Sequence, residues 1–312
     1  MTIRRLAEHG YINVAENNAG PKDVSIVFAF DSGYLEHFKV TLASLAISGN
    51  FIDSPIVIYT DDHSVARDNI VKICGDKIIL LEGAKKNLLY KLARDHVKRP
   101  ERADWNRGTF LKWMTFEKQD TTSVVFLDID MIFLKKFDLD IIHESKREFN
   151  ATPQFRPFLY QDENKRPLPE NDVFTNISNA VDGKYFGYMT KNINSGVMVL
   201  KGRFLSDDFF NEITNFAQKG VYVNEQTVFS KYFIREPQFL NLLHGAYNFQ
   251  DSYLYKLTLQ ERYSIMERVI VLHYAGPVKP WKSIPTINSQ NTWIGRSLWH
   301  WHRTMADKLL RA

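Results

Sequence analysis

The stretch SVVFLDIDMIF, residues 123–133, places two carboxylates one residue apart at the end of an apolar run. The four consecutive apolar residues 124–127 are typical of a strand that is covered on both faces of a sheet. Ligands of open parallel α/β sheets bind at the carboxyl ends of such strands. Asp128 and Asp130 occupy that end, so we predict that they form a metal or substrate site.

A second Asp-X-Asp triplet, Asp138-Leu139-Asp140, shows why context matters. A triplet of this kind is expected about once by chance in a chain of this length, so the motif alone is weak evidence. The second pair follows no apolar run and lies in a connection rich in Lys and Asp. We therefore predict that it forms a solvated turn or a helix cap.

Composition narrows the class of protein. The 312 residues suit one large α/β domain or two small ones, and a formal charge of +4 is too small for a typical nucleic-acid binder. The single cysteine, Cys74, excludes an internal disulfide framework and suits a reducing compartment. No secretory signal opens the sequence, and no apolar run approaches the ~20 residues that cross a bilayer. We expect a cytoplasmic protein that is at most peripheral on the inner face of the membrane.

Apolar runs alternate with helical spacings along the chain. The predicted strands are 24–30, 55–60, 77–81, 123–127, 195–202 and 269–274. The predicted helices begin near Tyr34 or cover 63–74, 104–119, 206–218 and 224–234. This order predicts a mostly parallel sheet with helices on both faces. Residues 150–190 lack steady periodicity, which is typical of an irregular insertion with a functional role or little order.

Several of these segments resemble glycosyltransferase family 8, the retaining enzymes that include glycogenin and bacterial lipopolysaccharide galactosyl- and glucosyltransferases. The resembling segments are IVFAFDSGYLEHFKVTLASL (26–45), RGTFLKWMTFEKQDTTSVVFLDIDMIFLKKFD (107–138), NINSGVMVLKGRF (192–204), NEQTVF (224–229) and VLHYAGPVKPW (271–281). They follow the family's order, which is more specific than any single motif.

The resemblance implies a GT-A type α/β fold over residues 1–285. It also implies a UDP-sugar donor, with galactose or glucose as the sugar, and a glycan acceptor such as lipopolysaccharide or capsule. The insertion at 150–190 would shape the acceptor site.

The same resemblance implies a metal site made by Asp128, Asp130 and His273. An imidazole ligand favours Mn²⁺ over Mg²⁺, although Mg²⁺ is the more abundant ion. Such a metal neutralises the departing diphosphate as a Lewis acid. Lys279 would reach the donor phosphates, and Gly276 would let the backbone approach them closely.

By resemblance, Phe28, Ala29 and Asp31 would line the uracil and ribose, and Tyr34 would stack on the base. The chain departs from the family here, because Ser32-Gly33 replaces a second acidic residue and an Asn. This departure concerns the exact uracil contacts and not the location of the site.

The donor sugar would be held by residues from three further segments. Lys112 stands where the family has a donor-contacting basic residue, and Ile129 lies between the two acids. Glu225 and Gln226 replace the family's common Asp-Gln pair. Gln226 would lie near the exposed face of the anomeric carbon, while Glu225 and Asn194 would contact the sugar. The family retains anomeric configuration and lacks an agreed nucleophile.

Each of these residues also has a purely structural interpretation when it is taken singly. The alternatives are an interior histidine for His273, solvated lysines for Lys112 and Lys279, a turn at Asn194, a first-turn acid for Glu225 and a helix start for Tyr34.

The C-terminal tail, residues 286–312, lies outside the resemblance. Its four Lys and Arg residues against one Asp give it a net charge of 4 − 1 = +3. Trp293, Trp299 and Trp301 are half of the chain's six tryptophans. If 294–311 is helical, one stripe contains Ile294, Leu298, Trp301, Met305 and Leu309. Such a helix fits an anionic membrane surface or packs on the domain's own core.

Three other functions would also use parts of this sequence pattern. A metal-dependent nucleotidyl- or phosphoryl-transferase would carry a Gly-rich basic loop, and no Lys or Arg cluster follows Gly33. A silent nucleotide-sugar-binding module would lack a metal ligand or the phosphate lysine, and this chain has them all. A glycogenin-like self-glycosylating enzyme needs an exposed tyrosine near the site, and Tyr160, Tyr185 and Tyr188 leave that open.

Overall fold

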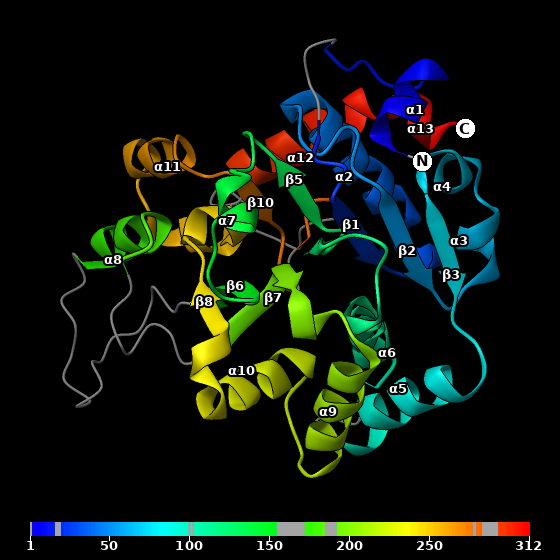
Figure 1. Ribbon diagram of the computed structural model, residues 1–312. Helices are drawn as coiled ribbons and strands as arrows, with labels where there is room; N and C mark the ends of the chain where they lie inside the picture. Colours follow the sequence, from blue (N-terminus) through cyan, green and yellow to red (C-terminus); the bar gives the residue numbers. More distant parts are fainter. Residues whose placement is uncertain are drawn as a thin grey trace.

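The computed structural model describes residues 2–15, 20–98, 101, 103–154, 172–184, 192–276, 279–282 and 293–312. Within these residues a large sheet and a small sheet are surrounded by helices (Figure 1). The large sheet has seven strands in the order β3-β2-β1-β4-β7-β6-β8. Their bounds are β1 Val24–Ala29, β2 Ile56–Thr60, β3 Lys77–Leu80, β4 Ser123–Leu127, β6 Phe149–Gln154, β7 Asn192–Lys201 and β8 Leu240–Leu242.

The first four strands of this sheet form the predicted parallel arrangement. β1 pairs in parallel with β2 and β4, and β2 pairs in parallel with β3. β7 runs antiparallel to β4 and to β6, while β6 and β8 are parallel. The sheet is therefore mostly parallel, as the alternating pattern predicts, and it gains an antiparallel extension beyond β4.

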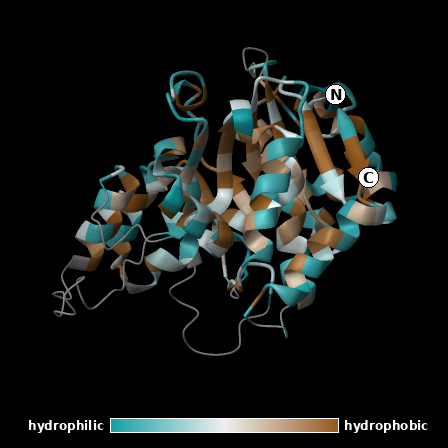
Figure 2. Ribbon diagram, turned by 60° about the horizontal axis from the view of Figure 1, so that its bottom comes forward, coloured by the Kyte–Doolittle hydropathy of each residue, from teal (hydrophilic) through white to brown (hydrophobic). Residues whose placement is uncertain are grey.

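Successive side chains of a strand point to opposite faces of the sheet. Here each face packs into a hydrophobic cluster of its own, so both faces are buried. In β4, Val125 and Leu127 join one hydrophobic cluster, and Val124 and Phe126 join the other. The hydropathy colours show the result, with apolar strands inside and polar helix faces outside (Figure 2). This two-sided burial accounts for the continuous apolar runs in the sequence.

Different helices cover the two faces (Figure 1). The first cluster includes side chains of α1 Ile3–Glu8, α2 Leu35–Ser48, α3 His63–Arg67, α4 Asn69–Cys74, α7 Asp140–His143, α8 Asp172–Val181, α11 Leu259–Met266, α12 Trp293–Met305 and α13 Asp307–Leu310. The second includes side chains of α5 Gly83–Asp95, α6 Ala103–Leu111, α9 Asp207–Gln218 and α10 Glu225–Arg235.

The small sheet has the order β5-β10-β9, with β5 Met131–Phe133, β9 Phe249–Gln250 and β10 Val271–His273. β10 is antiparallel to β5 and pairs His273 with Met131. The chain leaves β4, passes through residues 128–130 and enters β5, so it crosses from the large sheet to the small one. The two acids therefore lie at the junction of the sheets.

Several helices differ from their predictions. The predicted helix 63–74 is two helices, because Asp68 has an extended backbone (ψ 137°) and its carboxylate accepts from Ile70 N and Val71 N to cap α4. The predicted helix 104–119 ends as α6 at Leu111 and continues as a 3₁₀ turn, η3 Lys112–Phe116. Helix α5 was not predicted.

The segment predicted to be irregular, 150–190, contains all of β6 except Phe149 and all of α8. Residues 155–171 and 185–191, including Tyr160, Tyr185 and Tyr188, lie outside the described residues. The second Asp-X-Asp pair behaves as predicted. The Asp138 carboxylate accepts from Asp140 N at 3.0 Å where α7 begins, and both acids are exposed.

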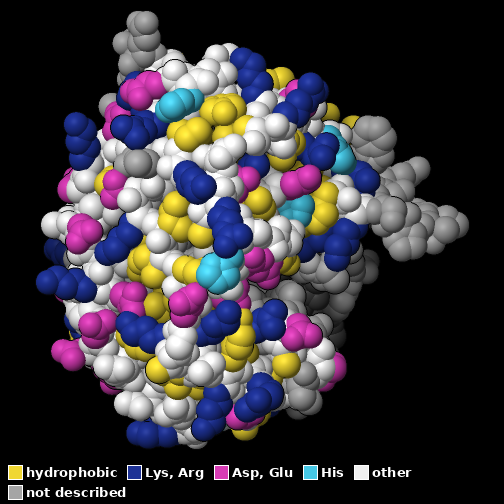
Figure 3. Space-filling view, turned by 90° about the vertical axis from the view of Figure 1, so that its right-hand side faces the viewer, with side chains coloured by type: hydrophobic (Ala, Val, Ile, Leu, Met, Phe, Trp, Pro, Cys, Tyr) yellow, Lys and Arg dark blue, Asp and Glu magenta, His cyan; other side chains and the backbone are white. Residues whose placement is uncertain are grey.

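The tail forms α12 and α13, and α12 packs beside α2. The predicted apolar stripe is partly wrong. Trp301 and Met305 are each 47% exposed, whereas Trp299, His302, Ala306 and Leu309 are buried. None of the described helices is both long enough and apolar enough to span a membrane. The face that includes α3 and α4 shows scattered charges of both signs, which agrees with the modest net charge (Figure 3).

Candidate functional site

Asp128, Asp130 and His273 converge at the junction of the two sheets. Each offers one ligand atom, and these atoms lie within 4.8 Å of one another. His273 Nε2 is 3.1 Å from Asp130 Oδ1 and 3.9 Å from Asp128 Oδ2. The strand pairing sets this geometry, because Tyr274 N donates to Asp130 O at 2.9 Å and so fixes β10 beside the acids.

The His273 ring is oriented by Asn248, which lies in the 3₁₀ turn η7 Gly245–Asn248. His273 Nδ1 is 2.7 Å from Asn248 Oδ1, and both residues are buried. An amide oxygen only accepts, so Nδ1 carries a hydrogen and Nε2 is the ring nitrogen that faces the carboxylates. Sequence reasoning missed Asn248, because no motif surrounds it.

Gly196 was also missed as a site residue, although it lies in the quoted Asn-Ser-Gly triplet. A Cβ at this position would lie 2.6 Å from Met131 Cε and 2.7 Å from His273 Cε1. Its carbonyl also accepts from Asp128 N at 2.8 Å. Glycine is therefore required here because the histidine ring packs directly on the β7 backbone.

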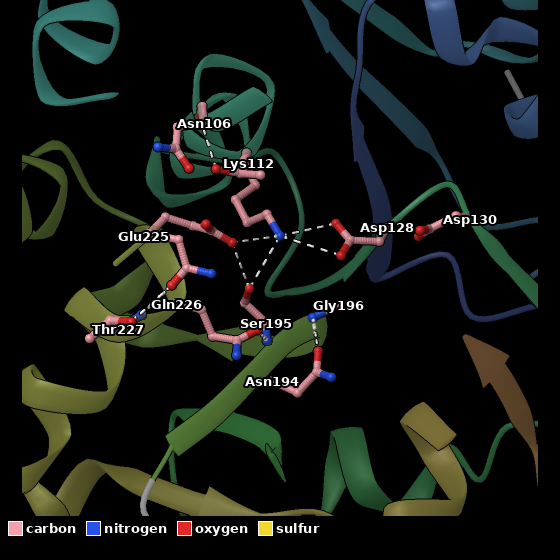
Figure 4. A network of polar contacts seen from close by, with 12 residues as sticks. Asn106, Lys112, Asp128, Asp130, Asn194, Ser195, Gly196, Glu225, Gln226 and Thr227 are labelled. Carbon is pink, nitrogen blue, oxygen red and sulfur yellow. Dashed lines mark hydrogen bonds and ion pairs between the residues drawn. The ribbon is translucent and has the colours of Figure 1, made fainter. Parts of the chain in front are cut away.

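Lys112 lies at the centre of a second set of contacts (Figure 4). Its Nζ is 3.0 Å from Asp128 Oδ1 and 3.2 Å from Glu225 Oε1, and it donates to Ser195 Oγ at 3.2 Å. Only 4% of Lys112 is exposed, which excludes the solvated-lysine alternative. The residue begins η3, so the end of α6 at Leu111 places it under the β4 terminus.

Glu225 and Gln226 open α10, whose N-cap is Asn224. Glu225 Oε1 accepts from Ser195 Oγ at 3.1 Å, and its Oε2 is buried without a hydrogen-bond partner among the described residues. Gln226 Oε1 accepts from Ser195 N at 3.3 Å, and its Nε2 donates to Gln154 Oε1 at 2.9 Å. Glu225 is thus a first-turn acid that also contacts the buried lysine.

Asn194 and Ser195 lie inside β7, which begins at Asn192, so the alternative of a turn at Asn194 is wrong. β7 is antiparallel to β4, and its first half therefore extends past the carboxyl end of β4. Asn194 Oδ1 accepts from Gly196 N at 3.0 Å, and its carbonyl accepts from Asn248 Nδ2 at 3.5 Å. This arrangement connects the lysine cluster to the histidine cluster.

Lys279 lies on the other side of the acids. Its Nζ is 2.5 Å from Asp130 Oδ2 and donates to Tyr274 O at 2.6 Å. The residue is mostly buried, with 13% of its side chain exposed, so it is not a solvated loop lysine. Gly276 has φ +94°, and a Cβ there would meet nothing, so its backbone conformation is what favours glycine.

The net pKa shifts of the two aspartates are opposite, although neighbouring cations lower the pKa of both. Burial raises the pKa of Asp128, and the nearby Lys112 and His273 do not fully offset that rise. Burial acts in the same direction on Asp130, but Lys279 and His273 outweigh it and hold the pKa of Asp130 well below its usual range. For Lys112, Asp128 and Glu225 outweigh a lowering by burial, so its pKa is raised.

The residues predicted to hold the base lie near the end of β1. Phe28 is fully buried and packs against Phe38, so its side chain belongs to the core and only its backbone faces the strand end. Ala29 is half-buried, and burial raises the pKa of Asp31, whose Oδ1 accepts from Gly33 N at 2.9 Å. Tyr34 is partly buried against the core.

Ile129 is buried between the two acids, and Thr41 Oγ1 donates to its carbonyl at 2.9 Å. A pocket of about 650 Å³ lies beyond the ends of β1 and β2. It is lined by Asp31, Ser32, Asp61, Asp62, His63, Lys86, Tyr90 and Arg107.

The site therefore offers a divalent metal two carboxylate oxygens and one imidazole nitrogen, all within 4.8 Å of one another. That donor set fits a divalent cation with transition-metal character. Lys279 adds a cation beside it, which suits a ligand with several negative charges.

Comparisons with known proteins bear on the family and the fold. The family model described as Glycosyl transferase family 8 matches residues 25–285. No curated protein sequence shows a significant match. Among solved structures, the glycosyltransferase GlyE of Streptococcus pneumoniae TIGR4 is 17% identical with a TM-score of 0.55, over 92% of this chain and 63% of GlyE. The chain thus spans less than two thirds of GlyE.

The galactosyltransferase LgtC, solved with donor and acceptor sugar analogs, is 16% identical with a TM-score of 0.54, over 90% of this chain and 95% of LgtC. The bifunctional glycosyltransferase WbbM is 13% identical with a TM-score of 0.51, over 95% of this chain and 53% of WbbM. These likenesses show the GT-A type fold that the sequence predicts. Because the family model covers most of its length, this chain belongs to glycosyltransferase family 8.

Proposed function

We propose that the protein transfers a hexose, galactose or glucose, from a UDP-sugar to a glycan acceptor such as lipopolysaccharide or capsule, with retention of anomeric configuration. One observation carries the proposal: two carboxylates and an imidazole converge at a strand end, with Lys279 at 2.5 Å from Asp130. A diphosphate leaving group needs positive charge in this arrangement.

Asp128, Asp130 and His273 would hold Mn²⁺, with Mg²⁺ as the alternative. When it is bound, such an ion supplies Lewis-acid charge to the diphosphate. The protein's own groups prepare the site for it. Asn248 keeps the hydrogen on His273 Nδ1, and Lys112 holds the Asp128 carboxylate in place at 3.0 Å.

Lys279 would bind the donor phosphates from the open side of the site. Its ammonium already faces the carboxylate of Asp130. If Lys279 were buried without that carboxylate, the neutral form of its amine would be favoured. Because Asp130 outweighs burial and raises the pKa of Lys279, the side chain keeps its charge at neutral pH. The charge is therefore available for a phosphate oxygen.

The donor sugar would lie between Glu225, Gln226 and Asn194. Glu225 Oε1 is engaged by Lys112 and Ser195, while Oε2 is buried and has no partner among the described residues. A sugar hydroxyl that donates to Oε2 would satisfy this atom. Gln226 would lie near the anomeric carbon, and its amide is held on both sides by Ser195 N and Gln154.

The nucleoside would lie at the end of β1. Asp31 and the backbone of Phe28 and Ala29 would contact uracil and ribose, and Tyr34 would stack on the base. Gly276 would let the loop backbone approach the diphosphate.

We also propose a catalytic domain at 1–285 and a tail at 286–312 that touches the cytoplasmic face of a membrane. Met305 is 47% exposed, and Arg303 and Arg311 have side chains that are 48% and 79% exposed. This combination suits an anionic surface. Co-sedimentation with phosphatidylserine vesicles tests it, and equal pelleting with neutral vesicles would refute it.

The enzymatic proposal is tested by donor hydrolysis without acceptor, across a panel of nucleotide sugars with Mn²⁺, Mg²⁺ or EDTA. We expect slow UDP release from one donor, abolished by EDTA and by Asp130→Ala. Asp138→Ala is the matched control, because Asp138 belongs to the exposed Asp-X-Asp pair and should leave the rate unchanged. UDP binding is followed by calorimetry in the same samples, and metal-independent binding, or none, would refute the metal site.

A further inference from the structure

The tail that lies beyond the family match packs against the segment that carries Lys279. Trp299 of α12 is fully buried, and its ring centroid is 4.7 Å from that of Trp281. Trp281 lies two residues after Lys279, in the described segment 279–282. A side chain from α12 thus contacts the loop that holds the proposed phosphate-binding cation.

His37 of α2 contacts the same ring. The His37 and Trp281 rings are stacked with centroids 3.8 Å apart and an interplanar angle of 27°. His37 also meets Trp299 edge-on at 5.5 Å. Burial lowers the pKa of His37 to about 4, so the imidazole is uncharged at neutral pH and packs as an aromatic ring. The three rings form one cluster from three separate segments.

Polar contacts reinforce this packing. Arg296 Nη1 donates to Lys282 O at 3.0 Å, and Tyr274 Oη donates to Gly295 O at 2.6 Å. Within the loop, Lys282 N donates to Lys279 O at 3.1 Å. The first turn of α12 is therefore bonded both to the end of the loop and to Tyr274, whose carbonyl accepts from Lys279 Nζ.

The position of the Lys279 ammonium depends on these contacts. A lysine side chain has four rotatable bonds, so a fixed Nζ requires a fixed backbone. Here Nζ lies 2.5 Å from Asp130 Oδ2 and 5.5 Å from the centroid of the Trp281 ring. The Lys279 side chain is held by Asp130, and the backbone two residues later is held by the packing of the Trp281 ring.

We propose that Trp299 and His37 are positioning residues that clamp Trp281 and thereby hold Lys279 in place for the donor diphosphate. This inference rests on the proposed function, and it gives the tail a role in donor binding. Trp299 acts through Trp281 and Lys279, so it governs phosphate affinity and leaves nucleoside affinity alone.

The experiment compares Trp299→Ala with Trp301→Ala. Both residues are tryptophans of α12, but Trp301 is 47% exposed. The ring contacts of Trp281 described here are with His37 and Trp299, not with Trp301. Trp299→Phe is the conservative variant and keeps an aromatic ring in the clamp. Calorimetry in Mn²⁺ measures UDP and uridine affinity, and hydrogen exchange of the ligand-free protein reports on the Lys282 amide.

We expect Trp299→Ala to weaken UDP binding about tenfold, the factor that corresponds to the loss of one modest charge-assisted contact. Uridine affinity should stay unchanged, and Trp299→Phe should restore most of the UDP affinity. In a Lys279→Ala background, Trp299→Ala should have no further effect on UDP, because the two act in series. The Lys282 amide should exchange faster in Trp299→Ala than in Trp301→Ala.

Equal exchange of the Lys282 amide in the two alanine variants would overturn the clamp, whatever the ligand does. Parallel losses of UDP and uridine affinity would also overturn it, because they indicate general damage to the fold. If Trp299→Ala does not fold, Trp299→Leu, which removes the ring but keeps an apolar side chain, takes its place in the same comparison. A wild-type protein that binds neither ligand would contradict the proposed function, and hydrogen exchange would still decide the clamp.

Discussion

Replacing Lys112 by Met tests whether this lysine holds the centre of the site together. The substitution keeps an unbranched side chain of similar length but removes the ammonium, which lies 3.0 Å from Asp128 and 3.2 Å from Glu225. At an effective dielectric constant of about 20, each contact is worth roughly 5 kcal/mol before desolvation is counted. The burial of the ammonium offsets several kcal/mol of that sum.

The net loss in the free energy of unfolding comes mainly from the two carboxylates that would remain without their lysine partner. The Glu225 side chain is 4% exposed and the Asp128 side chain is 27% exposed, so water can replace the lysine at Asp128 but scarcely at Glu225. Removing one partner of a buried pair costs about 3–5 kcal/mol, and we expect a loss of stability in this range at pH 8. The double variant Lys112→Met/Glu225→Gln should recover at least about 1 kcal/mol, because it no longer buries that charge.

The loss should also depend on pH. The wild-type contribution of Lys112 is constant from pH 5 to 8, because its pKa is raised and its stabilisation disappears only above the pKa of about 10.4 in the unfolded chain. In the variant, the folded protein keeps carboxyl protons that the unfolded chain releases, so stability rises as the pH falls from 8 to 5. The difference from wild type should therefore shrink towards pH 5.

Urea unfolding in EDTA at pH 8, 6.5 and 5 measures these differences. Lys39→Met is the matched control, because Lys39 is also buried and contacts one carboxylate, Asp68, at 2.9 Å. The Asp68 carboxylate keeps its bonds to Ile70 N and Val71 N, so the control should lose less stability. A loss below about 1 kcal/mol for Lys112→Met at pH 8, or one that does not change with pH, would refute the reasoning.

Three further substitutions test neighbouring features. Asp251 has a pKa that burial raises to about 7, so the folded state keeps a proton that the unfolded chain loses above about pH 4. Asp251→Asn should therefore add about 3 kcal/mol at pH 8 and almost nothing at pH 4 in urea unfolding with EDTA, and a gain that is equal at both pH values would contradict this. Asn248→Ala removes the acceptor for His273 Nδ1 and should weaken Mn²⁺ binding 10- to 100-fold in a titration followed by electron paramagnetic resonance, whereas an unchanged affinity would show that the ring needs no such partner. Gly196→Ala brings a Cβ to 2.6 Å from Met131 Cε and 2.7 Å from His273 Cε1, so it should lower stability by about 1–3 kcal/mol and also weaken Mn²⁺ binding.

The parallel half of the sheet was predictable because its strands carry their signal locally. Buried parallel strands require unbroken apolar runs, and 24–29, 56–60 and 123–127 have them. The two acids after β4 could be separated from Asp138 and Asp140 by the same rule. Helix α5 was missed although its pattern is amphipathic, and β5 and β9 have only three and two residues, too few for a periodicity to appear.

Contacts within the site were harder to predict, because they join segments that are distant in the chain. Nothing next to Lys112 in the sequence indicates that it is buried, since its partners are supplied by the residue after β4, by β7 and by α10. The tail shows a different limit. Its buried face includes Gly295, His302 and Ala306, which hydropathy patterns do not count as apolar anchors, and His302 satisfies its Nδ1 with Leu298 O at 2.8 Å. The exposed Trp301 therefore looked like a core residue.

The antiparallel pairing of β10 with β5 has a consequence for how the protein is made. Asp128 and Asp130 leave the ribosome well before His273, Lys279 and Trp299, which follow far later in the chain. The closure of so long a loop is slow, so the two halves of the site meet only after most of the chain has been translated. A nascent chain can thus fold its parallel strands first, and the metal site that we propose is complete only after β10 and the segment with Lys279 have been translated.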